Sequence, residues 1–292
     1  MRTVLVTGAN GFIGAALAPA LRDAGFGVRT AGRSAACDRR VASLGATTDW
    51  RAALAGVDAV VHLAGPAHAR YSVEALQSAI ADGTAQLAAQ AASAGVQHFV
   101  FVSSIKACAE QSQAPLREGD IPAPADAYGQ AKLAAERALI AEQRLTATIL
   151  RPPLVYAPNA KGNFARLLQL AHSAWPLPLA AINNRRSFLA LQSLIAAVLA
   201  VLRYPQRAAG VFHLADEPAL STTDLIALLR RGMGHKPQVL AAPLGSQHLL
   251  PAQLRCNLEV DSAKFRSLFP EWSLQDVRAG LIACAAQWRA GK

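Results

Sequence analysis

The chain has 292 residues, of which 52% are hydrophobic and 16% are charged, and its formal net charge is +10. This length and composition are enough to bury one large core or two lobes, and they exclude an extensively disordered chain. No run of about 18 apolar residues is present, and the first residues lead into a strand rather than a signal peptide. We therefore expect a cytoplasmic protein with no membrane partner.

The positive charge is scattered along the chain. Only three Arg–Arg pairs are adjacent, at 39–40, 185–186 and 230–231, and no aromatic-basic motif accompanies them, so nucleic acid is not expected as a partner. A positive field that attracts an anionic cofactor and substrate explains the charge more simply. The four cysteines are far apart and form no C-x-x-C pair, so we expect neither a metal site nor a disulfide framework.

The first half of the sequence alternates strand and helix patterns. Apolar runs predict strands, and helical spacing predicts helices between them. The predicted strands cover residues 2–7, 27–31, 58–63, 98–102 and 146–150, and the predicted helices cover 12–24, 72–94 and 126–143. This alternation predicts an α/β fold of the Rossmann type, a doubly wound parallel sheet with helices on both faces.

After residue 151 proline becomes frequent and the pattern changes. We predict a helix over 164–173, and then a strand over 186–191, a helix over 194–202 and a strand over 210–214 that return to the sheet. Helices near 222–231 and 274–290 belong to a smaller C-terminal substrate lobe. The predicted dinucleotide-binding domain is therefore 1–155 with a return segment of about 186–215, and the substrate lobe is 156–185 with 216–292.

Three glycines mark the turn between the first strand and the first helix. Gly8, Gly11 and Gly14 stand where a dinucleotide fold needs a tight turn, close approach of the pyrophosphate and close packing of helix on strand. The N-terminus of the helix adds N–H groups and a positive dipole. Phe12 and Ile13 complete this cofactor-binding turn, and we expect their side chains to face the sheet.

The second predicted strand ends without an acidic residue. An Asp or Glu there would accept the ribose hydroxyls of NAD, but this chain has Gly32 followed by Arg33 and Ser34. Arg33 can pair with a 2′-phosphate, which favours NADP(H) and leaves NAD(H) as the alternative. A solvated surface arginine is the other interpretation of Arg33. Ala64 and Gly65, which end the third strand without bulk, are expected to lie against the cofactor.

Tyr128 and Lys132 are four residues apart on a predicted helix and so share one face. A nearby ammonium and the positive nicotinamide ring lower the pKa of a phenol toward the range useful for proton transfer. Ser104, at the end of the fourth strand, can donate a hydrogen bond to the reacting oxygen, with Ser103 as the competing hydroxyl. An ordinary surface helix with an ion-pairing lysine is the alternative, and the upstream glycine turn argues against it.

These motifs resemble the extended short-chain dehydrogenase/reductase family of nucleotide-sugar epimerases, dehydratases and 4-ketoreductases. The resemblance is strongest to bacterial UDP-N-acetylhexosamine 4-epimerases and 4-ketoreductases, in which Ser-Ser-Ile-Lys and Arg-Arg-Ser-Phe recur. It implies a UDP-sugar substrate used for surface polysaccharide synthesis, with Asn163 and Arg186 holding the diphosphate or nucleotide. It leaves a homodimer open. The matching segments are 4–14, 62–65, 101–106, 126–136, 150–158 and 162–164.

Several positions depart from the family pattern and bear on the reaction. Ile80 replaces an Asn, Ala157 a Gly, Ala190 a His and Gln192 an acid. Ser104 is followed by Ile105 and Lys106 rather than by the acidic pair that the family's dehydratases use, which disfavours dehydration. Cys108 and His172 could suggest a C3/C5 epimerase, but Cys108 is displaced from the position that the family uses.

Redox chemistry at C4 remains, as a 4-epimerase or a 4-ketoreductase, and the same residues serve both. Two alternatives stay open from the sequence. One is a reductase of small ketones or aldehydes, and the other is a non-catalytic protein that senses a dinucleotide. The intact set of Ser104, Tyr128 and Lys132 argues against a sensor, which needs no acid–base pair.

Overall fold

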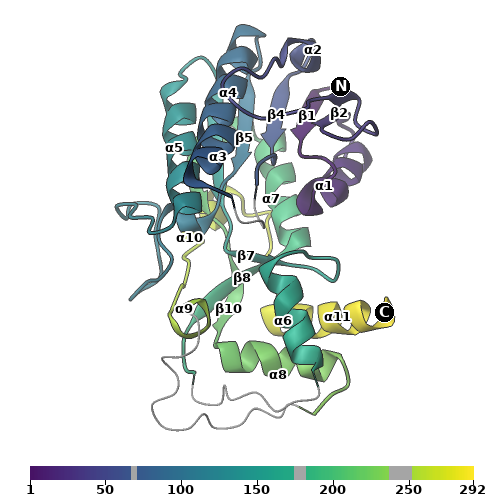
Figure 1. The fold of residues 1–292 in the computed structure, drawn as a ribbon, viewed down its shortest axis with the longest axis vertical. Coiled ribbons are helices and arrows are strands. Elements are labelled where there is room, and N and C mark those ends of the chain that lie inside the picture. Colours follow the sequence, from purple (N-terminus) through teal and green to yellow (C-terminus); the bar gives the residue numbers. More distant parts are fainter. Residues whose placement is uncertain (67–70, 174–181, 237–251) are drawn as a thin grey trace.

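A computed structural model of the chain describes residues 1–66, 71–173, 182–236 and 252–292. Its centre is a parallel seven-stranded sheet in the order β3-β2-β1-β4-β5-β6-β9 (Figure 1). The strands are β1 (Thr3–Thr7), β2 (Gly27–Gly32), β3 (Arg39–Arg40), β4 (Ala59–His62), β5 (His98–Val102), β6 (Thr146–Arg151) and β9 (Gly210–His213). The expected α/β doubly wound sheet is confirmed. Because the strands are parallel, all their carboxyl ends lie along one edge.

Alternate residues of the strands feed two cores on opposite faces of the sheet. Val4 and Val6 pack with α1 (Phe12–Asp23) and α7 (Leu191–Arg203), whereas Leu5 packs with α4 (Gly83–Ser93) and α5 (Ala127–Ala141). Strands covered on both faces are continuously apolar, which is why these runs were recognisable in the sequence. α10 (Ala263–Leu268) adds Phe265 to the first core.

The long helix expected over 72–94 is interrupted. It consists of α3 (Val73–Leu76), a π-helical turn η1 (Gln77–Asp82) and α4, and η1 packs along α5. Ser72 begins it by accepting a hydrogen bond from the N–H of Ala75 at 3.2 Å. A π-helical turn shifts the register of the residues that follow, and such turns are frequent near functional sites. Periodicity predicted the helix and its ends but not this insertion.

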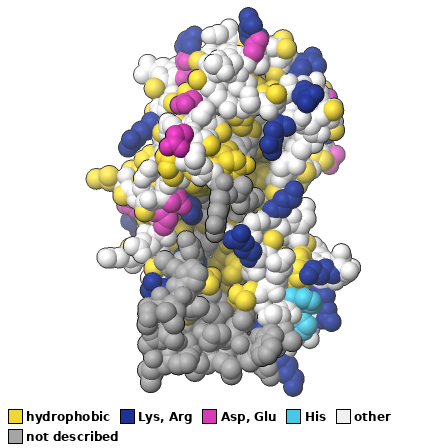
Figure 2. All heavy atoms as spheres, in the orientation of Figure 1, with side chains coloured by type: hydrophobic (Ala, Val, Ile, Leu, Met, Phe, Trp, Pro, Cys, Tyr) yellow, Lys and Arg dark blue, Asp and Glu magenta, His cyan; other side chains and the backbone are white. Residues whose placement is uncertain are grey.

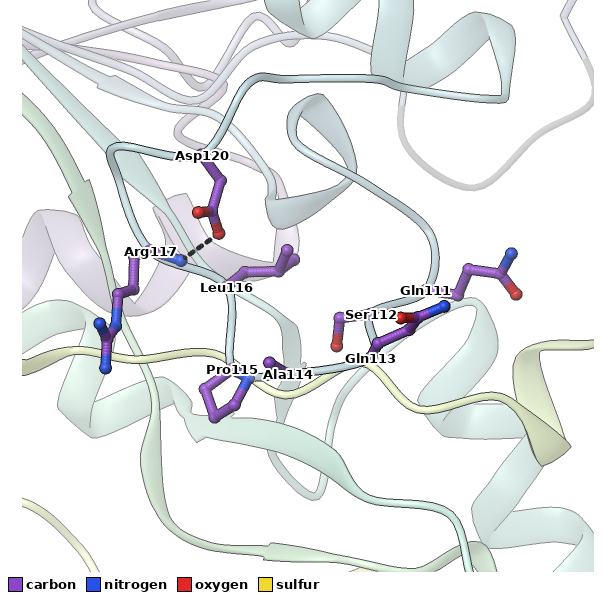
Figure 3. A pocket seen from close by; sticks show the side chains of 8 residues that line it. All are labelled: Gln111, Ser112, Gln113, Ala114, Pro115, Leu116, Arg117 and Asp120. Atoms are coloured by element: carbon purple, nitrogen blue, oxygen red, sulfur yellow. Dashed lines mark hydrogen bonds between the residues drawn. The ribbon is translucent and has the colours of Figure 1, made fainter.

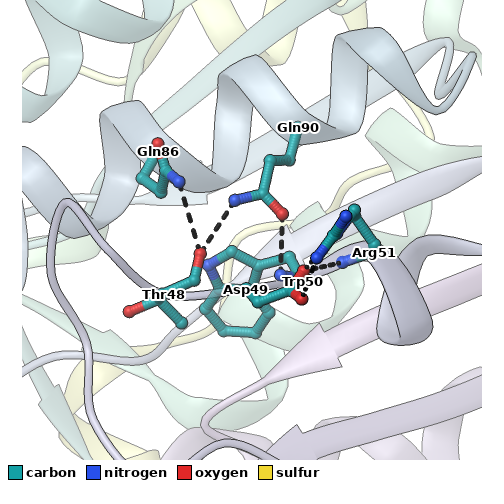
Figure 4. A network of polar contacts seen from close by, with 6 residues as sticks. All are labelled: Thr48, Asp49, Trp50, Arg51, Gln86 and Gln90. Atoms are coloured by element: carbon teal, nitrogen blue, oxygen red, sulfur yellow. Dashed lines mark hydrogen bonds and ion pairs between the residues drawn. The ribbon is translucent and has the colours of Figure 1, made fainter.

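Side-chain hydrogen bonds fasten the segment before α2 (Arg51–Leu54) to α4 (Figure 4). Gln90 donates to the carbonyl of Thr48 at 2.8 Å and accepts from the N–H of Trp50 at 2.7 Å. Trp50 itself is buried in the core on that face of the sheet. The loop that leads into β4 is therefore anchored, and with it the strand that ends beside the glycine turn.

A second sheet, in the order β10-β8-β7, links the two lobes. It contains β7 (Leu154–Tyr156), β8 (Arg186–Ala190) and β10 (Asp216–Leu220). The sequence prediction was wrong for the strand that begins at Arg186, which we expected in the central sheet. The central sheet ends at β9, which occupies the place beside β6, and β8 pairs with β7 in parallel and β10 in antiparallel. An apolar run fits either sheet, so only tertiary pairing decides between them.

The smaller lobe packs α6 (Asn163–His172), α8 (Thr222–Gly232) and α11 (Val277–Ala290) around a core of its own, at the end of the molecule opposite α2 (Figure 1). Short elements complete the described chain: η2 (Ile105–Ala107), η3 (Pro205–Arg207) and α9 (Ala252–Arg255). Among the described residues no helix is both long enough and apolar enough to cross a membrane.

Candidate active site and cofactor turn

The glycine turn has the geometry that a pyrophosphate requires. Gly8 has a φ of 69°, and a Cβ there would lie 2.9 Å from the nitrogen of Ala64. A Cβ on Gly14 would lie 2.6 Å from the Cα of Ala9, so only glycine lets α1 approach the turn. Gly11 precedes α1, and no described side chain caps its N-terminus. The first N–H groups of α1 are thus available to an anion.

The two apolar residues of the turn point to different cores. Ile13 packs against the central sheet, as expected, but Phe12 packs against the core of the C-terminal lobe, so its expected placement on the sheet is wrong. The two positions are adjacent and so face different sides of α1. Phe12 therefore joins the cofactor turn to the lobe that we expected to hold substrate.

A buried hydrogen-bonded chain that the sequence did not predict supports the turn. Thr7 Oγ1 accepts from the N–H groups of Leu63 and Ala64 at 3.3 Å, so its proton points to His62 Nδ1 at 2.6 Å. His62 Nε2 then donates to Thr84 Oγ1 at 3.1 Å. Burial, together with Lys132, lowers the pKa of His62 to about 3. A neutral histidine thus joins the ends of β1 and β4. The sequence feature that could have revealed this contact is the polar residue that ends each of these buried strands, Thr7 and His62.

The residues expected near the adenosine end lie after β2. Arg33 is exposed, and among the described residues no ion pair involves it. Where an acid would stand, a Cβ on Gly32 would lie 3.1 Å from the sulfur of Cys37. Cys37 Sγ in turn donates to Asn10 Oδ1 of the glycine turn at 2.6 Å. Gly65, which has a φ of 153°, is exposed at the end of β4.

The two serines after β5 have different surroundings. Ser103 is buried and donates to Glu136, which also forms an ion pair with Arg151 at 2.6 Å. Ser104 is partly buried, and its Oγ accepts from the N–H of Lys106 at 3.2 Å as the N-cap of η2. Ser103 is therefore committed to an interior network, whereas the hydroxyl proton of Ser104 stays available.

Tyr128 and Lys132 lie on α5 close to the end of β5. Lys132 Nζ donates to the carbonyl of Val102 at 3.0 Å and lies 5.8 Å from the centre of the Tyr128 ring. Burial lowers the pKa of Lys132 to about 8, although Glu136 opposes this. Burial, with a further contribution from Asp126, raises the pKa of Tyr128 to about 12. At neutral pH the phenol keeps its proton, and a cation brought close to it would lower that pKa.

The residues expected to bind the diphosphate lie on the second sheet and the lobe beyond it. Asn163 is exposed at the start of α6. Arg186 is partly buried at the start of β8, and its guanidinium donates to the carbonyl of Cys256 at 2.9 Å. Burial lowers the pKa of Arg186. Among the described residues no hydrogen bond joins Asn163 and Arg186 to each other or to Tyr128.

Two cavities lie on the loop that joins η2 to α5. One of about 510 Å³ is lined by residues 111–117 and Asp120, which Figure 3 shows around the bend of this loop. The other, of about 500 Å³, is lined by residues 111–113 and 255–257 and so adjoins Cys256, the partner of Arg186. Neither is lined by Ser104, Tyr128 or Lys132. No motif in the sequence predicted these cavities.

The charged and potential metal-ligating side chains are dispersed over the described part of the molecule. On the face drawn in Figure 2, Lys and Arg side chains are spread over both lobes rather than gathered into one patch. In the described part of the chain no group of three or more His, Cys, Asp or Glu could hold a metal ion. Cys108 is buried in one cluster while His172 pairs with His235 in the C-terminal lobe, so these two do not form an acid–base pair.

Known proteins resemble this chain in sequence and in fold. Residues 4–215 match the NAD dependent epimerase/dehydratase family. A UDP-glucose 4-epimerase of Vibrio cholerae is 32% identical over 260 residues, 83% of this chain and 79% of that one, and a ceramide reductase of Caulobacter vibrioides is 28% identical over 251 residues, 82% and 73%. The crystal structure of UDP-N-acetylglucosamine 4-epimerase from Bacillus cereus superposes with a TM-score of 0.84 at 22% identity, over 99% of each chain.

Proposed function

The chain belongs to the NAD dependent epimerase/dehydratase family, and from this premise we propose that it is a 4-epimerase of a UDP-linked hexose or N-acetylhexosamine. The observation that carries the proposal is the packing of α5, which carries Tyr128 and Lys132, against η2, which Ser104 caps, at the sheet edge that also holds the glycine turn. The similarity to the Vibrio cholerae UDP-glucose 4-epimerase supports the substrate class.

The residues present fit a dinucleotide. The cradle of Gly8 and Gly14, which a Cβ would fill, and the uncapped start of α1 suit its pyrophosphate. A bound NAD would supply the hydride acceptor and donor for the sugar carbon. Lys132, whose Nζ lies 5.8 Å from the centre of the Tyr128 ring, is the proposed ligand of the nicotinamide ribose, and a positive charge there favours the phenolate form of Tyr128.

Tyr128 is the proposed acid–base residue. Its phenolate takes the proton of the C4 hydroxyl as that carbon loses its hydride, which leaves a 4-keto sugar. Ser104 donates a hydrogen bond to the resulting carbonyl oxygen and holds it in place. After the keto sugar rotates within the site, Tyr128 returns the proton to the oxygen as the opposite face of C4 receives the hydride. Atoms and electrons balance over the cycle, so the cofactor ends in its starting oxidation state.

Arg186 and Asn163 are the proposed contacts to the diphosphate. Arg186 is a partly buried cation whose partner is a neutral carbonyl, so an anion can take that carbonyl's place. The cavity of about 500 Å³ that adjoins Cys256 offers space beside it. Charge-assisted hydrogen bonds of this kind contribute about 1.5–3 kcal/mol, enough to position the sugar carbon from a distance.

We further propose that the adenosine end accepts NADP(H) as well as NAD(H), with a preference for NADP(H). The support is the glycine at position 32 and the exposed Arg33 without an ion-pair partner among the described residues. Titration of both dinucleotides, followed by reduced-cofactor fluorescence, tests this in the wild type and in Arg33→Met. The variant should lose the preference for NADP(H), and equal loss for both dinucleotides would contradict the proposal.

The function is tested by incubating the protein and NAD with UDP-glucose and with UDP-N-acetylglucosamine and observing the C4 epimers by proton NMR. Tyr128→Phe should lower turnover by about 10²–10⁴-fold while cofactor binding is retained, because only the proton transfer is removed. Tyr204→Phe is the matched control, since Tyr204 lies at the end of α7 and contacts Arg207. Turnover by Tyr128→Phe at the wild-type rate would overturn the assignment.

The similarity to the ceramide reductase favours a second candidate, reduction of a ketone that carries no nucleotide. The same residues would serve, with Tyr128 donating its proton to the carbonyl oxygen, and a bound reduced cofactor would supply the hydride. The two functions differ in their need for a diphosphate. If millimolar UDP and UDP-N-acetylglucosamine both fail to raise the melting temperature with cofactor present, the ketone reductase becomes the better conclusion.

A further inference from the structure

The backbones of η2 and α5 touch next to the proposed acid–base residues. A Cβ on Gly129 would clash with the carbonyl oxygen of Lys106 and would lie 3.0 Å from the Cβ of Pro124. Gly129 directly follows Tyr128, and Lys106 is two residues after Ser104. The close contact therefore fixes the element that carries Ser104 against the element that carries Tyr128.

An ion pair joins the same two elements. Lys106 Nζ contacts Asp126 Oδ2, while Asp126 Oδ1 caps α5 by accepting from the N–H of Gly129 at 2.7 Å. Glu110 accepts from the N–H groups of Ala125 and Asp126 at 2.8 and 3.0 Å. The carboxylate of Asp126 is thus held on both oxygens, two residues before Tyr128 and with a cation on its other side.

We propose that Lys106 and Asp126 are positioning residues that tune the proton transfer of Tyr128, Asp126 through its negative charge and Lys106 by balancing that charge. The inference rests on the proposed role of Tyr128 as the acid–base residue. Lys106, the lysine of the Ser-Ser-Ile-Lys segment, has no role in the reaction steps themselves, and the proposed role accounts for it.

The sign of each effect follows from the charges. Burial is the main reason that the pKa of Tyr128 is raised, and the Asp126 carboxylate raises it further because a phenolate beside it is repelled. Burial alone would raise the pKa of Asp126 as well, but hydrogen bonds from Lys106 and Gly129 outweigh it and hold that pKa low. Asp126 is therefore ionised at neutral pH, and Lys106 screens it.

Other charged groups around Tyr128 are few among the described residues. On α5 itself, Lys132 faces the ring of Tyr128. The elements packed against α5 contribute Glu74 on α3, Asp82 on η1 and Arg151 on β6, and Arg151 is paired with Glu136. No ion pair or hydrogen bond in the described chain joins Glu74 or Asp82 to Tyr128. The pair of Lys106 and Asp126 is thus the local charge that can be altered without touching Lys132.

The test is a titration of phenolate absorbance in the near ultraviolet. The curve of Tyr128→Phe, which contains only the other three tyrosines, is subtracted to isolate the signal of Tyr128. Asp126→Asn, which keeps an oxygen to cap α5, should lower the pKa of Tyr128 by about 1 unit. Lys106→Met should raise that pKa above its wild-type value, because it removes the balancing cation. In the double variant the pKa of Tyr128 should return toward its wild-type value. Lys106→Arg, which keeps the positive charge, should have the same pKa as the wild type. The pH profile of kcat should shift in the same directions.

The ion pair of Glu142 and Arg144 at the far end of α5 provides the control. Arg144→Met and Glu142→Gln should leave the titration and the pH profile unchanged. If Asp126→Asn and Lys106→Met shift the titration in the same direction, or neither shifts it, the pair is merely structural and the proposal is wrong. Should Lys106→Met fail to fold, Lys106→Gln makes the same comparison. The titration needs no turnover, so it can fail while loss of activity in Tyr128→Phe still upholds the proposed function.

Discussion

Two ion pairs, one beside each sheet, differ sharply in burial. Glu136 and Arg151, at the carboxyl end of β6, are 1% and 4% exposed, whereas Arg185 and Glu259, beside the second sheet, are 60% and 21% exposed. A buried pair is kept only when its remaining donors and acceptors are satisfied, and Ser103 does this for Glu136. An exposed pair exchanges with water and is weakly held.

This difference matches the proposed division of work. On the helix that carries the proposed acid–base residues, Lys132 and Glu136 are held by interior partners, so the proposed site needs little rearrangement before a substrate binds. In the second sheet, Arg186 has a backbone carbonyl as partner and must change partner to bind a diphosphate. The buried pair of Glu136 and Arg151 thus suits preorganisation, and the carbonyl-bonded Arg186 suits exchange with an anion.

Breaking the buried pair should have the largest effect on stability. Glu136→Gln or Arg151→Met leaves its partner charged, buried and uncompensated, which costs about 3–5 kcal/mol of unfolding free energy. Urea unfolding at neutral pH measures the loss. A loss below about 1 kcal/mol in both variants would show that the pair behaves as an exposed one, and the contrast between the lobes would fail.

Arg186→Met should weaken UDP binding by about 10–100-fold, because one charge-assisted contact of about 1.5–3 kcal/mol is lost. The expected signature is a higher KM with little change in kcat, and isothermal titration with UDP measures the binding directly. Arg203→Met, at the exposed end of α7, is the matched control. Unchanged UDP affinity in Arg186→Met would remove Arg186 from the diphosphate site.

The buried His62 should make the stability of the central-sheet lobe depend on pH. Burial lowers the pKa of His62 from 6.5 to about 3. Between these two values the imidazole is protonated in the unfolded chain and neutral in the folded one. Stability should therefore fall as pH drops through this window, by about 1.4 kcal/mol per unit from this residue. Urea unfolding of His62→Gln between pH 6 and pH 5 should show a slope smaller by that amount. An unchanged slope would mean that His62 is protonated in the fold.

The smallest effect is expected for the exposed pair. Arg185→Met and Glu259→Gln should each change the unfolding free energy by about 0.2–1 kcal/mol, because water replaces the lost partner. The same urea titration measures it, and added salt should reduce the wild-type advantage further. A loss of several kcal/mol would place this pair with the buried one and undo the comparison.

Local patterns were enough to predict the nucleotide-binding half. The strands β1, β4 and β5 are buried apolar runs, α1 and α5 have 12 and 15 residues, and Gly8, Gly11 and Gly14 follow a strand directly. Each of these signals lies within a short stretch of sequence. Tyr128 and Lys132 are likewise four residues apart on one helix. The sequence by itself therefore determined the fold class, the turn and the candidate acid–base residues, because neighbours along the chain specify all three.

Contacts between distant segments decided the rest. β8 pairs with β7 and β10 rather than with the central sheet, and Phe12 faces the C-terminal lobe. Ser103 differs from Ser104 because Glu136, 33 residues away, accepts a hydrogen bond from its hydroxyl. Likewise Lys106 meets Asp126 across 20 residues. Adjacent serines and short apolar runs look alike in sequence, and they become distinct only when folding supplies each with a particular partner.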